Sequence, residues 1–116
     1  MPRTDERRWH YRIHYPERAM LGFEMAGATL RVEDISETGM RYQLAEGEQA
    51  PEVDAEFAGV LKLHEGRATE LHVVVARVQG RSVSCRLFPP GIPLNVMFAE
   101  QRWLLRRYPL LFRAAS

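Results

Sequence analysis

The sequence predicts a mainly β fold, an antiparallel barrel or sandwich, with one helix near its C-terminus. Short runs of alternating apolar and polar residues recur along most of the chain, and glycine, proline or small polar residues separate them. After Pro89-Pro90-Gly91 the apolar residues change to a helical spacing. A chain of 116 residues is long enough to fold as one domain with its own core.

Six segments have the alternation or the β-branched content expected of strands. They cover residues 18–24, 28–33, 40–44, 57–64, 69–78 and 82–88. Between the third and fourth strands, residues 45–54 predict a polar loop, and we interpret its carboxylates as solvated rather than as a catalytic pair. We interpret His64 and His72 as ordinary strand histidines and Cys85 as a small buried residue.

The final helix is expected to begin near Pro93, which suits the first turn of a helix, and to end before Pro109. Its apolar residues predict a stripe that covers one opening of the barrel: Leu94, Met97, Phe98, Leu104, Leu105 and Tyr108. On the other side of the helix we expect the polar residues Asn95, Glu100, Arg102 and Arg106. A docking surface for a partner is the alternative use of the stripe. The apolar tail after Pro109 either folds back or meets another chain.

Residues 1–16 predict a flexible, arginine-rich arm that precedes the barrel and helix of residues 17–116. The segment from Arg7 to Arg12 has no strand or helix pattern of its own. Tyr15 precedes a proline, which disfavours the α region and ends any helical tendency. Arg8 and Arg12 are therefore expected on an extended or looped segment. A helical turn would also bring them to one face, so their spacing alone does not decide the conformation.

The stretch from Asp34 to Gly39 is predicted to be a polar turn between the second and third strands. Short connections rich in Asp, Ser and Gly are common, because these residues cap, turn and tolerate unusual backbone angles. Here the turn combines a carboxylate, a hydroxyl and a glycine with the spaced arginines of the arm. Together they predict a two-part polar site for a ligand that carries phosphates and bases rich in hydrogen-bond donors.

Arg8-x-x-x-Arg12 followed by Asp34-x-Ser36-x-x-Gly39 resembles the two-part signature of the PilZ domain, a small bacterial β-barrel module. The resemblance covers nearly the whole chain, because the remaining strands and the terminal helix also fit. It implies a six-stranded antiparallel β-barrel with a C-terminal helix and a flexible N-terminal arm. It also implies that the chain binds the second messenger cyclic di-GMP, as members with both motifs do.

With cyclic di-GMP as the ligand, each motif residue has a chemical role. Arg8 and Arg12 can each hold a phosphate or the N7/O6 edge of a guanine through two parallel hydrogen bonds. Asp34 can accept from the N1 and N2 donors of guanine. Ser36 can donate or accept at a third point. Gly39 allows close backbone approach, and supplies a positive φ if the turn requires one.

The resemblance also implies how the signal leaves the receptor. In the family the arm closes over the ligand, and its ordering is the output, so we expect cyclic di-GMP and an unidentified protein effector as partners. Arg7 is similar to an arginine of members that take up an intercalated pair of ligand molecules. Ser84 departs from the family, whose last strand commonly has a glycine there. The aromatic side chains of Trp9, His10 and Tyr11 either stack on a base or pack against the barrel.

Composition limits the alternatives. A formal net charge of +1 argues against binding of a nucleic acid polymer, including single-stranded RNA. Lys62 is the only lysine among 16 Lys and Arg residues, and arginine suits bidentate recognition of phosphate and guanine. No signal core or membrane-span pattern is present, so we expect a cytoplasmic protein without membrane insertion. No catalytic or metal motif is found, and the remaining alternative to a receptor is a PilZ-fold interaction module that does not bind nucleotide.

Overall fold

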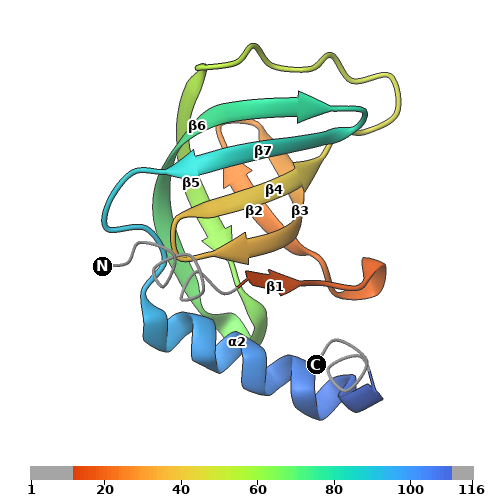
Figure 1. The fold of residues 1–116 in the computed structure, drawn as a ribbon, viewed down its shortest axis with the longest axis vertical. Coiled ribbons are helices and arrows are strands. Elements are labelled where there is room, and N and C mark those ends of the chain that lie inside the picture. Colours follow the sequence, from red (N-terminus) through yellow and green to blue (C-terminus); the bar gives the residue numbers. More distant parts are fainter. Residues whose placement is uncertain (1–11, 111–116) are drawn as a thin grey trace, which may run out of the picture.

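The computed structural model describes residues 12–110 of the chain (Figure 1). Within this range, six antiparallel strands form a closed barrel: β2 (Leu21–Met25), β3 (Ala28–Ser36), β4 (Gly39–Gln43), β5 (Glu56–Lys62), β6 (Ala68–Gln79) and β7 (Ser82–Leu87). Their order is β3-β2-β5-β6-β7-β4, and a further pairing of β3 with β4 closes the ring. Closure leaves no free sheet edge among these six strands. The six-stranded barrel predicted from the sequence is confirmed.

The ends of the predicted strands agree with the structure to within about three residues, and the largest differences are at the start of the first strand and the end of the second. Arg18 and Ala19 were expected in the first strand. They lie instead in a short 3-10 helix, Glu17–Ala19, which follows Pro16. Proline fixes its own φ near the value found in turns, which favours a tight turn before β2 begins.

A seventh strand, β1 (Arg12–His14), pairs with the end of β3. The side chains of Ile13 and Tyr15 are buried in the core, whereas Arg12 and His14 are exposed. Residues 12–16 were expected in the flexible arm, and the structure packs them against the barrel. The alternation Arg-Ile-His-Tyr is the period-2 pattern of a half-buried strand. The rest of the predicted arm, with Arg7 and Arg8, lies outside the described residues.

Two β-bulges interrupt the alternation of the barrel strands, one at Glu33 in β3 and one at Ala76 in β6. A bulge adds one residue to one strand, so the side chains that follow it change face. Strict alternation would place Asp34 and Arg77 on the same face as the buried valines of their strands. Because of the bulges, both residues join the outer face of the barrel.

Helix α2 (Leu94–Arg107) lies across one end of the barrel, as expected from its apolar residues (Figure 1). The face that enters the core differs from the predicted stripe. Met97 and Leu104 are fully buried, but Leu94, Phe98 and Leu105 are 44–45% exposed. Glu100, which was expected on the solvent side, is fully buried between Met97 and Leu104. In the described part of the chain, no helix is long and apolar enough to cross a membrane.

Candidate functional site

The connection between β3 and β4 is shorter than predicted. β3 continues through Asp34 and Ile35 to Ser36, and only Glu37 and Thr38 separate it from β4. The six-residue polar turn predicted from the sequence is therefore wrong in extent. Asp34 continues the strand because it pairs with neighbours on both sides, His14 of β1 and Arg41 of β4.

Two motif residues shape this tight connection. The backbone N–H of Thr38 donates a hydrogen bond to Oγ of Ser36 at 3.4 Å, which holds the chain in its reversal. Gly39 does not have a positive φ, so the conformational reason for a glycine does not apply. Its reason is steric, since a Cβ on Gly39 would lie 3.1 Å from the carbonyl oxygen of Cys85. Glycine thus lets β4 and β7 approach each other closely.

The carboxylate of Asp34 is the electrostatic centre of this region. Its Oδ1 accepts a hydrogen bond from Nη1 of Arg12 at 3.0 Å. Its Oδ2 lies 3.4 Å from Nδ1 of His14 and 3.4 Å from Nε of Arg41. The Asp34 side chain is only 2% exposed, so these partners replace the water that a buried carboxylate needs. Asp34 therefore orients Arg12, and its predicted contact with guanine stays a prediction.

A pocket of about 470 Å³ lies on the outer face of β4, β6 and β7, next to β1. Its lining residues are Arg12, Ser36, Thr38, Gly39, Met40, Arg41, Ala76, Arg77, Ser84, Cys85 and Arg86. The structure thus brings together three of the site residues predicted from the sequence, Arg12, Ser36 and Gly39. Asp34 does not line the pocket, although it pairs with two arginines that do.

Three pocket arginines were not predicted from the sequence: Arg41, Arg77 and Arg86. Arg41 and Arg86 alternate with buried neighbours along β4 and β7, and this period-2 pattern is the sequence signal that indicates their place on the outer face. Nothing in the pattern of β6 shows that Arg77 joins them, because its position depends on the bulge at Ala76.

The pocket also reaches the buried Cys85, where burial raises the pKa of the thiol to about 12 and keeps it protonated.

The segment that leads to α2 supports the β3–β4 connection from behind. The backbone N–H of Ile92 donates to the carbonyl oxygen of Glu37 at 3.1 Å, and that of Leu87 donates to Thr38 at 2.9 Å. Gly91 has a φ of +73°, and a Cβ there would overlap the carbonyl oxygen of Glu37. This close contact requires glycine for both conformation and space.

Replacing Gly91 with alanine is expected to destabilise the fold by about 1–3 kcal/mol and to shift the Glu37–Thr38 connection. Gly47→Ala is a matched control, because Gly47 has a φ of +80° but nothing within 4 Å of its added Cβ. Both variants have the backbone cost, and only Gly91→Ala has the overlap. Urea unfolding of the two measures the difference. Equal loss of stability would contradict the steric role of Gly91.

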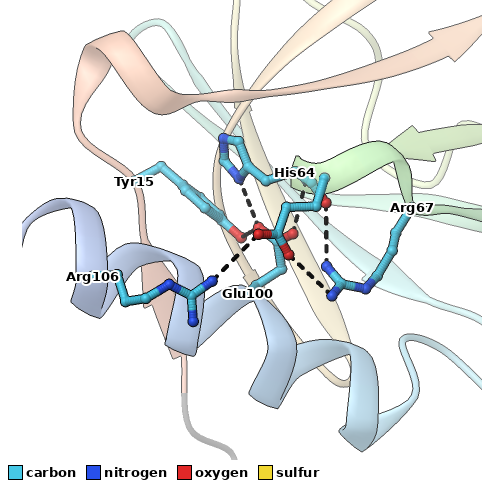
Figure 2. A network of polar contacts seen from close by, with 6 residues as sticks. Tyr15, His64, Arg67, Glu100 and Arg106 are labelled. Atoms are coloured by element: carbon cyan, nitrogen blue, oxygen red, sulfur yellow. Dashed lines mark hydrogen bonds and ion pairs between the residues drawn. The ribbon is translucent and has the colours of Figure 1, made fainter.

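A second polar cluster joins the strand β1 region to α2 (Figure 2). Oε1 of the fully buried Glu100 accepts a hydrogen bond from the Tyr15 hydroxyl at 2.6 Å, and Oε2 accepts the backbone N–H of His64 at 2.9 Å. Nδ1 of His64 also lies 2.9 Å from Oε1. The His64 ring stacks on Trp103 of α2 with ring centroids 3.6 Å apart. Tyr15 follows β1 directly, so the strand that carries Arg12 is tied to the helix.

The sequence interpretation of two members of this cluster was wrong. His64 begins the short 3-10 helix His64–Gly66 rather than ending a strand, and Glu100 faces the core. Around them, Arg67 and Arg106 lie at 3.2 and 3.3 Å from the carboxylate of Glu65 at the surface (Figure 2). No sequence signal identified Glu100, because glutamate on a helix is exposed in most proteins.

Comparisons with known proteins identify a matching family and two solved structures with a similar fold. Residues 6–107 match the family described as PilZ domain. The structure of the Bacillus subtilis inhibitor of motility MotI/DgrA is similar with a TM-score of 0.60 and 18% identity, over 92% of this chain and 56% of that chain. An uncharacterized Legionella protein is similar with a TM-score of 0.55 and 13% identity, over 92% of this chain and all of the other (100%). The chain thus spans about half of the MotI/DgrA chain. No curated protein sequence matches this chain.

Proposed function

We propose that this chain, which belongs to the PilZ domain family, is a cytoplasmic receptor for cyclic di-GMP. The family match covers residues 6–107, most of the chain. PilZ domains are typically non-catalytic receptor domains that bind cyclic di-GMP. The observation that supports this function most directly is the pocket itself, because Arg12 of the first motif and Ser36 and Gly39 of the second line it together.

Each described motif residue has a proposed task in the complex. Arg12 holds a phosphate or the N7/O6 edge of a guanine, and Asp34 keeps its guanidinium at the pocket edge before the ligand arrives. When the ligand engages Arg12, Oδ1 of Asp34 becomes available to accept from the N1 and N2 donors of guanine. The Ser36 hydroxyl can donate or accept a hydrogen bond with the ligand. Gly39 has no side chain, so it leaves space for the ligand in the pocket. Arg7 and Arg8 complete the site from the part of the predicted arm that precedes β1.

The output in this proposal is an ordering of the arm that an unidentified protein effector recognises. Tyr15 connects β1 to Glu100, so a change at Arg12 is transmitted toward α2. The alternative, an interaction module without nucleotide, is favoured by one observation: the apolar side chains of Leu94, Phe98 and Leu105 are 44–45% exposed on α2. Exposed apolar side chains that gather on one element can form an interaction surface.

Calorimetric titration of the purified chain with cyclic di-GMP tests the proposal. We expect saturable binding, and much weaker binding of cyclic di-AMP, because adenine has a donor where guanine has the O6 acceptor. A thermal unfolding series with the same two ligands is the independent measurement, since a ligand that binds only the folded state raises the unfolding temperature. Absence of both heat and thermal shift at high cyclic di-GMP concentration would favour the interaction module.

A further inference from the structure

We propose that Arg77 and Arg86 form a second, phosphate-binding side of the pocket, facing the ligand from β6 and β7. This inference rests on the proposed function, because it concerns the same ligand in the same pocket. Neither residue belongs to the two motifs. Both line the pocket together with Arg12, Ser36 and Gly39.

Strand register places these arginines around a floor of small side chains. Arg77 pairs with Ser84, Ser84 pairs with Arg41, and Arg41 pairs with Asp34, which makes one row across four strands. In a neighbouring row, Gly39 pairs with Arg86. Directly paired side chains on adjacent strands are about 5 Å apart. Serine and glycine therefore leave space for a ligand between the longer arginine side chains.

The positive charges of Arg77 and Arg86 are not neutralised by acidic residues in the pocket. Arg12 and Arg41 both pair with Asp34, and no Asp or Glu is among the described residues that line the pocket. Arg77 and Arg86 are exposed, and their side chains have no hydrogen bond or ion pair with any residue in the range 12–110. Their charge is available to an anion, and a cleft lined by one sign of charge concentrates ligands of the other sign.

Arg86 also borders a second cavity that contains Asp54 and Glu56. It forms no ion pair with either carboxylate, and Glu56 lies 3.3 Å from Nε2 of His72 instead. The acidic residues of that cavity therefore do not neutralise Arg86 directly. In the other pocket, which Arg86 shares with Arg12, no lining residue is acidic.

The two sides of the pocket differ in how firmly their guanidinium groups are oriented. Asp34 fixes the fork of Arg12, which suits directional, bidentate recognition of a guanine edge. Nothing in the described residues orients Arg77 or Arg86 in this way. An arginine without an orienting partner acts mainly as a positive charge, and lysine can replace it in that role but not in bidentate recognition. This difference assigns Arg77 and Arg86 to phosphate.

The test compares alanine and lysine variants of both residues by calorimetric titration with cyclic di-GMP. We expect Arg77→Ala and Arg86→Ala each to weaken binding about tenfold, and the lysine variants to recover most of the affinity. The affinity difference between wild type and Arg77→Ala should shrink as salt rises, because exposed charges are screened. Arg102→Ala is the matched control, since Arg102 is an exposed arginine on α2 outside the pocket.

The outcomes separate this inference from the proposed function. Wild-type affinity in both alanine variants, with clear binding by the wild-type chain, would overturn the inference and leave the receptor function intact. Lysine variants as weak as the alanine variants would overturn the assignment to phosphate and favour a base edge. Failure of the wild-type chain to bind would overturn the receptor function and this inference with it. Thermal unfolding of each variant is the control that tests whether its fold is retained.

Discussion

Arg12→Ala is expected to lower the affinity for cyclic di-GMP by about 2–5 kcal/mol, which corresponds to roughly 30-fold to several thousand-fold in Kd. Arg12 lines the pocket, and Asp34 holds its guanidinium in place, so it needs little reordering to bind a ligand. Removing it also leaves a buried carboxylate with one cation fewer at the moment of binding. Calorimetric titration at constant pH and salt measures the change.

Two controls identify the cause of such a loss. Arg102→Ala removes an exposed arginine outside the pocket and should leave affinity unchanged. Thermal unfolding of Arg12→Ala should show a folded chain, because Arg41 and His14 still lie within 3.4 Å of Oδ2 of Asp34. Affinity within a factor of about three of wild type, in a folded variant, would remove Arg12 from the binding site.

Glu100→Ala is expected to reduce the free energy of unfolding by about 3–5 kcal/mol. The substitution removes the carboxylate oxygens that accept from the buried Tyr15 hydroxyl and from the backbone N–H of His64. It also leaves a cavity under the helix, because Glu100 is fully buried. Urea unfolding followed by circular dichroism measures the loss, and a smaller effect is expected for Glu100→Gln, which keeps the volume and one acceptor oxygen.

Glu65 is the comparison for Glu100 within the same cluster. Its carboxylate pairs with Arg67 and Arg106, but its side chain is 41% exposed. Exposed ion pairs contribute little, so Glu65→Ala should cost less than about 1 kcal/mol. If both variants unfold at the same urea concentration, the buried carboxylate does not stabilise the contact between β1 and α2.

Most of the fold was predictable from local patterns. Alternation and turn residues located all six barrel strands, and the change of period after Gly91 located α2. Arg12, Ser36 and Gly39 were found because their spacing resembles a known signature, and the structure places them in one pocket. The position of Arg41 on the outer face follows from the same alternation, once β4 is known to border the pocket.

Other features depend on tertiary structure and have no local signal. The bulges at Glu33 and Ala76 arise where strands of unequal length pair around a closed barrel, and no propensity marks them. Glu100 is buried because Tyr15 and His64, far away in the sequence, supply its partners. A sequence pattern reports the average tendency of glutamate, and only the packed structure brings such partners together.

The bulge at Ala76 places one extra residue between two stretches of β6 that each use their inward and outward faces. Val75 before the bulge is buried and Val78 after it packs against the core, although an odd number of positions separates them. Loss of residue 76 alone would restore strict alternation and leave Arg77 outside and Val78 inside. If the bulge were straightened with every residue kept, Arg77 would instead turn into the barrel and Val78 out of it. A relative of this chain that lacks a residue at position 76 is therefore expected to keep its pocket wall.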